Sequence, residues 1–411
     1  MPAAPSLLIV PYRSKTGKLY SQIPTSGAGD FTVTRNTTAT RFNSAGLIES
    51  VASGIPRLDY YTSGGTAGCP ALLVEPSATN LALQSEAWNV SPWAATSGGQ
   101  GATVSGNVTT SPDGTTNADK LIEAATTGTH FCLQNLTLTS GTTYTASFFA
   151  KASERTLGRF RMSGSGAYWD IDFNLSAVTV TGNTTAFIQN YGNGWYRIGG
   201  TFTANQASNS FILSLRDASG NTSYTGNGTN GVFVWGAQIE TGSVATSYIP
   251  TAAASGSRSA DVISVSGAVS GSIGQTEGVL YIECESNNGE DDVFYINRSI
   301  ANSIAIYKNV NNAYIGTIYH SSATITFQSG NNVSGMVKIA IAYKSGDSTM
   351  YLNGSRVGTL KTDAITFGAA LNNLAVNKNS QFFSGIKPSR IRAVALYNTR
   401  LTDAELATLT T

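Results

Sequence analysis

The residues of this 411-residue chain that could perform nucleophilic or acid–base chemistry are few and widely separated. Only two histidines occur, His130 and His320, and they fall in different predicted domains. A Ser/His/Asp or Cys/His site is therefore not predicted. In "GTHFCLQ", His130 and Cys132 would share one face of an extended strand. We interpret them as a core or sheet-surface pair rather than as a nucleophilic dyad.

Carboxylates cluster at two places, "YWDIDF" at 168–173 and "GEDD" at 289–292. On a strand, Asp170 and Asp172 would project from the same face. Paired acids can hydrolyse glycosides, hold Ca²⁺ or contact sugar hydroxyls. The alternatives are a solvated strand edge for the first cluster and a charged loop for the second, and we favour these alternatives. Neither cluster predicts a catalytic residue or a resident cofactor.

Exposed aromatic rings are the other side chains that bind sugars, because the C–H face of a sugar stacks on them. Trp169 follows Tyr168 and directly precedes Asp170. The candidate ligand-binding residues are therefore Tyr168, Trp169, Asp170 and Asp172. The other four tryptophans have structural interpretations: Trp195 and Trp235 as core residues, Trp88 and Trp93 as a seal where the N-terminal region meets the next domain.

The composition excludes several classes of function. Charged residues make up 12% of the chain, against about 25% in an average soluble protein. The net charge is +1 and no basic tract stands out, so no nucleic-acid partner is predicted. No apolar run approaches the roughly 18 residues of a membrane span. The four-residue run at 7–10 is too short for a signal-peptide core. The odd number of cysteines predicts buried free thiols rather than a disulfide framework.

Period-two alternation predicts the fold class. Tyr144, Ala146, Phe148 and Ala150 alternate with polar residues, with Phe149 as the exception. The stretch "GVFVWGAQI" at 231–239 is apolar on both faces and should be a central strand. We predict an all-β protein: an extended N-terminal arm (1–88), a jelly-roll β-sandwich (89–250), a Ser/Gly/Ala-rich linker (251–275) and a second β-sandwich (276–411). Asn353-Gly354 predicts a tight hairpin, and Thr402 with Glu405 predicts a capping box opening one short C-terminal helix.

The N-terminal region contains an unusual polar segment, "TRNTTATRFNSAGLIESV" at 34–51, followed by "PRLDY" and "LLVEPSATNLALQSEAW". This combination resembles a segment found in many tailed-phage virion proteins. The middle region, with "YTASFFAKA", "NGWYRIGGTFTA" and "VFVWGAQIETGSVATSYIPT", resembles carbohydrate-binding-module jelly rolls, and "SRSAD" follows it. The last region, with "MYLNGSRVG" and "IRAVALYNTRLTDAELATL", is similar to laminin-G and concanavalin-A-like sandwiches.

These resemblances imply a virion structural protein of the fibre, spike or capsid-decoration type, located on the particle surface. The expected partners are other virion proteins, further copies of the chain (a trimer is favoured) and host-surface glycans. A purely structural component and a glycan-degrading tailspike are the alternatives. An enzyme is not predicted.

A polar segment such as 34–86 cannot form a core of its own, but hydrogen bonds and arginine–carboxylate pairs can order it. We predict that this segment packs on the middle sandwich. Arg35, Arg41 and Arg57 would pair with Asp59, Glu75 or backbone carbonyls, and residues 72–74 would supply a buried strand. The alternative is an arm that lies on a neighbouring subunit.

Overall fold

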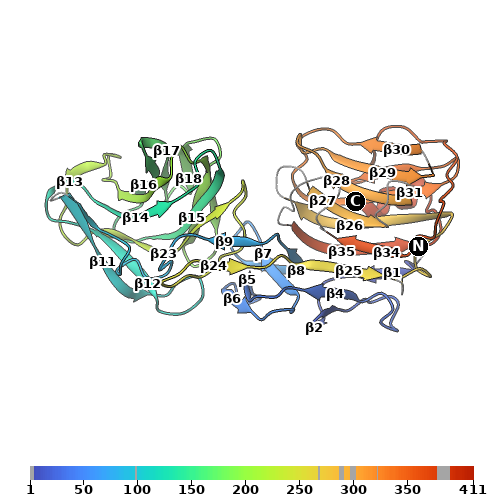
Figure 1. Cartoon of the computed structure of the whole chain (residues 1–411), viewed down its shortest axis with the longest axis horizontal. Helices are drawn as coiled ribbons and strands as arrows, with labels where there is room; N and C mark the ends of the chain where they lie inside the picture. Colours follow the sequence, from blue (N-terminus) through green and yellow to red (C-terminus); the bar gives the residue numbers. More distant parts are fainter. Residues whose placement is uncertain are drawn as a thin grey trace.

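The computed structural model describes residues 4–97, 100–266, 269–286, 291–296, 302–321, 323–376 and 389–411. Strands account for 52% and helices for 2% of the chain, which confirms the all-β prediction. Figure 1 shows two β-bodies arranged along the long axis, with N-terminal strands running below and between them.

The jelly roll is a sandwich of a seven-stranded and a five-stranded sheet. The seven-stranded sheet has the order β10 (Thr96–Ser97), β11 (Gln100–Thr109), β12 (Ala118–Glu123), β23 (Gly231–Thr241), β15 (Thr143–Ala152), β20 (Trp195–Thr203) and β19 (Phe187–Asn190). The five-stranded sheet has the order β14 (Phe131–Thr137), β21 (Ser208–Leu215), β16 (Leu157–Gly164), β17 (Gly166–Asn174) and β18 (Thr179–Gly182). A separate ribbon pairs β13 (Thr127–Thr129) with β22 (Ser223–Thr225).

The core of the jelly roll forms between these sheets, as the alternation predicts. Tyr144, Ala146, Phe148 and Ala150 all point into it. Strand β23 is covered on both faces and buried along nearly its whole length. Trp88 and Trp93 stack with ring centroids 4.2 Å apart, and both belong to this core.

The terminal sandwich also has two sheets, and strands from both ends of the chain build them. One sheet has the order β33 (Ser355–Arg356), β32 (Thr349–Leu352), β31 (Gly335–Lys344), β26 (Glu277–Ser286), β35 (Ser389–Tyr397), β8 (Ala67–Val74) and β7 (Arg57–Tyr61), with β1 (Leu7–Ile9) also paired to β35. The other has the order β2 (Ser14–Lys15), β3 (Lys18–Leu19), β4 (Phe31–Thr34), β25 (Val262–Ser266), β34 (Asn373–Val376), β27 (Asp291–Ile296), β28 (Asn302–Lys308), β29 (Tyr314–His320) and β30 (Ala323–Gln328).

This topology differs from the predicted domain boundaries at two places. The expected linker 251–275 contains β25, which pairs with β4 and β34 inside the nine-stranded sheet. The segment is rich in serine, but its stretch "VISVS" alternates between apolar and polar residues. Ile263 and Val265 of this stretch are buried in the core. The N-terminal region is not only an arm on the jelly roll, because Leu7, Phe31 and Leu72 lie in the core of the terminal sandwich.

Part of the N-terminal region does pack on the jelly roll. The hairpin of β5 (Ala39–Phe42) and β6 (Ile48–Val51) covers the outer face of the seven-stranded sheet, where Ile48 packs with Trp195 and Trp235. The short pair β9 (Ala78–Asn80) and β24 (Gly256–Arg258) lies between the two bodies in Figure 1. The N-terminal region therefore contributes to both sandwiches.

The predicted hairpin and helix both form. Asn353 and Gly354 have φ values of 47° and 80° between β32 and β33, which is the backbone that such a two-residue turn requires. Helix α1 (Asp403–Thr410) begins after Thr402, and the reciprocal hydrogen bonds of a capping box join Thr402 and Glu405. Leu406 of α1 packs on the outer face of the eight-stranded sheet.

Candidate functional site

The sequence-predicted acids lie on the outer face of the five-stranded sheet. The register of β16 and β17 places Arg159 opposite Asp172 and Arg161 opposite Asp170. Arg159 donates two hydrogen bonds to Asp172, of 2.7 and 3.0 Å, and Arg216 lies 2.5 Å from the same carboxylate. We call the outer side chains of these five residues the Arg–Asp face.

The charges of the Arg–Asp face are only partly neutralised. Burial disfavours ionised Asp172, but Arg159 and Arg216 nevertheless lower the pKa of its carboxyl. The other acid, Asp170, lies 3.3 Å from Arg161 and 3.9 Å from Arg159. Its side chain is 43% exposed, so this carboxylate can accept hydrogen bonds from a ligand.

The two predicted aromatic ligand contacts do not belong to the Arg–Asp face. Trp169 is only 4% exposed and lies in the jelly-roll core, where its ring contacts Phe160 edge-on. Alternation explains its position, because Trp169, Ile171 and Phe173 point inward while the two acids point outward. Tyr168 is the extra residue of a β-bulge, and its hydroxyl donates to Asn209 over 2.6 Å. The prediction of an exposed Trp169 is therefore corrected.

An open pocket of about 330 Å³ adjoins the Arg–Asp face where β17 extends beyond β18. Asp170, Gly182 and Asn183 line it, together with Tyr168 and Trp169. The predicted ligand-binding residues thus stay close in space, although only the two acids face outward. The pocket has room for a small polar group such as a sugar ring.

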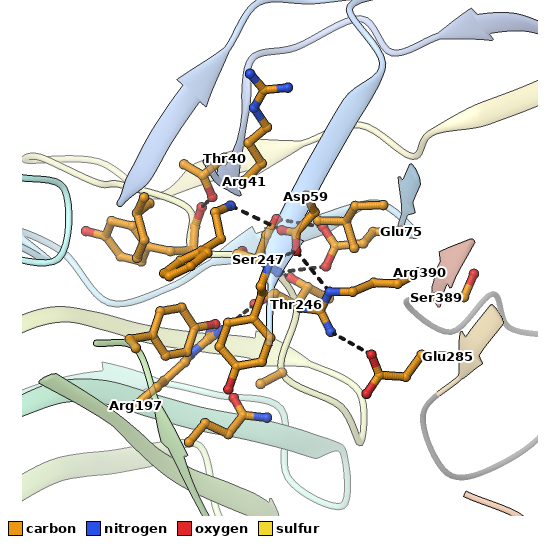
Figure 2. Close-up of a pocket in the computed structure, with 18 residues that line it drawn as sticks. Thr40, Arg41, Asp59, Glu75, Arg197, Thr246, Ser247, Glu285, Ser389 and Arg390 are labelled. Carbon is orange, nitrogen blue, oxygen red and sulfur yellow. Dashed lines mark hydrogen bonds and ion pairs between the residues drawn. The ribbon is translucent and has the colours of Figure 1, made fainter. Parts of the chain in front are cut away.

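The second candidate site is the junction between the two sandwiches, where buried arginines lie beside a small pocket whose lining residues Figure 2 shows. Arg57 is fully buried; its Nη1 lies 2.6 Å from Oε2 of Glu75, and its Nη2 donates to Asp261. Arg35 reaches Asp261 over 2.9 Å, and Arg258 reaches Glu75 over 3.2 Å. We call these five residues the junction network.

Electrostatics inside the junction network favour the charged forms of Glu75 and Arg57. Burial alone would raise the pKa of Glu75, but Arg258 and Arg57 hold it well below its ordinary value of 4.5, with help from the Ser247 hydroxyl. Burial likewise opposes the charge of Arg57, and the carboxylates of Glu75 and Asp261 outweigh it and raise its pKa. Each ion is therefore stable only while its partners remain in place.

The N-terminal segment forms some of the predicted ion pairs and replaces others. Arg57 contacts Glu75, as the sequence reasoning proposed. Arg35 donates to the backbone carbonyls of 37, 51, 52 and 55, as well as to an acid. Arg41 pairs instead with Glu49 of its own hairpin. Asp59 pairs with Arg390 of β35 over 3.0 Å.

Sequence reasoning missed Arg258 and Asp261, the two members of the network that come from the supposed linker. The signal was the "SRSAD" stretch itself, since an arginine and an acid in an otherwise neutral Ser/Gly-rich segment need partners. Ser247 was also missed; its amide and hydroxyl both donate to Glu75. These residues connect the end of the jelly roll to the N-terminal strands.

A small cavity of about 70 Å³ lies beside the network, and Figure 2 shows Asp59, Arg390 and Glu285 along it. Arg390 stacks on the ring of Tyr61 at 4.9 Å, and Tyr61 packs against Tyr191 of the jelly roll with ring centroids 5.0 Å apart. Because each acid that lines the cavity already has a cationic partner, the cavity presents no free acid–base pair. These contacts join the N-terminal region, the jelly roll and strand β35 of the terminal sandwich.

The remaining sequence candidates have structural surroundings. His130 and Cys132 are both fully buried, and the ring nitrogens of His130 lie 2.9 and 3.2 Å from the carbonyl oxygens of Gly101 and Tyr224. Burial raises the pKa of the Cys132 thiol to about 12. Cys69 is exposed, contrary to the prediction of buried thiols, because the first half of β8 is largely exposed.

The "GEDD" prediction lies largely outside the described residues, since 289 and 290 are not described and 291 begins β27. Within the part of the chain that the structure describes, no group of three or more His, Cys, Asp or Glu side chains could hold a metal ion. None of the described helices is long and apolar enough to span a membrane.

The junction network predicts a specific pH dependence. The pKa of Glu75 is lower in the folded chain than its ordinary value of 4.5. Ionised Glu75 therefore stabilises the fold above pH 4.5. This contribution is lost as the pH falls from there toward the lower pKa of the folded chain. We expect the difference in free energy of unfolding between the wild type and Glu75→Gln to shrink from pH 6 toward pH 3, measured by urea denaturation. A difference independent of pH would contradict the assignment.

Comparison with known proteins assigns the chain to no family. No protein-family model and no curated protein matches it. Matching solved structures include the Ruminococcus gnavus IT-sialidase CBM40 (14% identity, 34% of this chain and 84% of that chain, TM-score 0.29). Domain 4 of AbnA, an arabinanase from Geobacillus stearothermophilus, matches at 15% identity (37% and 73%, TM-score 0.29). The botulinum neurotoxin serotype D binding domain matches at 7% identity (36% and 40%, TM-score 0.29). Similarity at this level carries no conclusion about function.

Proposed function

We propose that the chain is a virion attachment protein of a tailed phage, located on the particle surface, whose jelly roll binds host-surface glycans. The observation that carries glycan binding is the Arg–Asp face, where planar guanidinium and carboxylate groups stand partly exposed on a sheet. Such groups form paired hydrogen bonds with neighbouring hydroxyls of a sugar. The virion assignment rests on the resemblance of residues 34–86 to phage virion proteins.

The junction supports this proposal, because an attachment protein needs a rigid connection between the part bound to the particle and the part that binds the host. The junction network joins the N-terminal strands to the end of the jelly roll, and it is buried from solvent. Association into trimers would multiply weak contacts with the host surface. The N-terminal region would then fix the subunit to other virion proteins.

Glycan binding is tested with the full chain on an array of bacterial surface polysaccharides. Asp172→Asn removes the charge that holds Arg159 and Arg216, so we expect about tenfold weaker binding, the usual cost of a lost charge-assisted contact. Asp347→Asn is the matched control, because Asp347 pairs with Arg400 over 2.8 Å in the terminal sandwich. If the wild-type chain binds no glycan, the proposed function is wrong. If Asp172→Asn and Asp347→Asn weaken glycan binding equally, the proposed site is wrong.

The virion assignment is tested separately. Mass spectrometry of purified phage particles should detect the chain in a fixed copy number, and gold-labelled antibodies should decorate the particle surface. Absence of the chain from intact particles would contradict this half of the proposal. A purely structural component would appear on particles without binding any glycan.

A further inference from the structure

The Arg–Asp face contains one positive charge more than its acids can balance. Three guanidinium groups, of Arg159, Arg161 and Arg216, meet only two carboxylates. Asp172 is fully engaged by two of these arginines, at 2.7 and 2.5 Å. The third arginine shares the remaining acid, Asp170, at the longer distance of 3.3 Å.

Of these three arginines, Arg161 is therefore the one with hydrogen-bond donors that the described residues leave unsatisfied. Its only hydrogen bond to a described side chain is the one to Asp170. Its Nε is buried and has no hydrogen-bond partner among the described residues. The neighbouring strand β21 places Ile212 opposite Arg161, so this neighbour supplies no acceptor side chain. With 34% of its side chain exposed, the group can reach a ligand.

The open pocket lies beside the ion pair of Arg161 and Asp170. Asp170, the partner of Arg161, lines the pocket together with Asn183. Trp169 also lines it, and its indole N–H is buried without a hydrogen-bond partner in the described part of the chain. A ligand in the pocket would meet the half-exposed carboxylate of Asp170 and the side-chain amide of Asn183, with the guanidinium of Arg161 beside that carboxylate.

Building on the proposed function, we propose that this site selects anionic glycans. A carboxylate or sulfate group of the sugar pairs with Arg161, which gives the excess positive charge its missing partner. Asp170 accepts hydrogen bonds from hydroxyls of the same or the next sugar, and the pocket receives the ring. Neutral sugars bind the hydroxyl-directed groups but give Arg161 no partner beyond Asp170, so they bind less tightly.

The test uses the full chain on an array that pairs neutral oligosaccharides with their uronic-acid and sulfated counterparts. We expect the anionic member of at least one pair to bind about tenfold more tightly, with the preference falling as ionic strength rises. The uronic-acid and sulfated arms distinguish the two sources of negative charge. Equal binding of neutral and anionic members would overturn the inference and leave glycan binding intact, whereas no binding to any glycan would overturn the proposed function itself.

Variants locate the preference. Arg161→Ala should abolish the anionic preference, and Arg161→Lys should retain part of it because charge remains while the paired N–H groups are lost. Arg356→Ala is the matched control, since it removes an arginine that pairs with Asp403 in the terminal sandwich. Circular dichroism confirms that each variant is folded. An unchanged preference in a folded Arg161→Ala variant would overturn the assignment.

Discussion

Arg57→Ala should destabilise the chain by about 3–5 kcal/mol, the cost of leaving buried ions without their partner. Arg57 has no exposed surface and contacts both Glu75 and Asp261, so its removal leaves two buried carboxylates short of positive charge. The nearest remaining arginines, Arg35 and Arg258, already bond to backbone carbonyls as well as to these acids. They cannot move to replace Arg57 without losing those bonds. Denaturation in guanidinium chloride measures the change.

Arg41→Ala is the matched control for that experiment. Arg41 belongs to the same N-terminal segment and pairs with Glu49, but its side chain is 24% exposed. We therefore expect a loss below about 1 kcal/mol, as for other solvent-accessible ion pairs. Similar losses for Arg41 and Arg57 variants would show that the buried network adds nothing special to stability.

The second large effect is expected from deletion of residues 1–88. The terminal sandwich would lose the strands β1, β7 and β8 from one sheet and β2, β3 and β4 from the other. Eight core side chains would go with them: Leu7, Ile9, Leu19, Phe31, Val33, Leu58, Leu72 and Val74. At about 1.5–3 kcal/mol for each buried side chain, the loss exceeds about 10 kcal/mol, which is comparable with the whole stability of a typical domain.

We expect the deleted chain to have an unfolded terminal sandwich, detected as rapid amide hydrogen exchange throughout β26, β31 and β35. The same deletion also uncovers Phe149 and Trp235 on the outer face of the jelly roll. Removal of only residues 1–5, which precede β1, is the control and should leave exchange unchanged. Protected strands in the chain that begins at 89 would show that the terminal sandwich is an independent domain.

The sequence is sufficient to predict features that depend on near neighbours. Alternation places Phe148 and Ile339 in their cores, and Thr402 with Glu405 predicts the beginning of the helix. Such signals lie within a few residues, where one period or one cap decides the outcome. The same alternation would have placed Trp169 with Ile171 and Phe173 inside the jelly roll, if it had been given priority over the adjacent acids.

Contacts between distant segments could not be predicted in this way. Leu7 pairs with Leu396, and Ile263 pairs with Val33, across most of the chain. No local pattern identifies such partners, because a short strand such as β1 carries the same alternation whichever sheet receives it. The junction network has the same limitation: Arg57 and Asp261 are separated by 204 residues. The glycan site depends on cross-strand register, which sequence alone leaves open.

Because the N-terminal strands belong to both sandwiches, we expect the whole chain to unfold as one cooperative body. All five tryptophans lie between residues 88 and 235, so tryptophan fluorescence reports on the jelly roll and on the N-terminal hairpin that packs on it. Far-ultraviolet circular dichroism reports on the strands of both sandwiches. The two signals should therefore give a single coincident transition with one midpoint during guanidinium denaturation. Two separate midpoints, with the jelly roll unfolding independently of the remaining strands, would contradict the account.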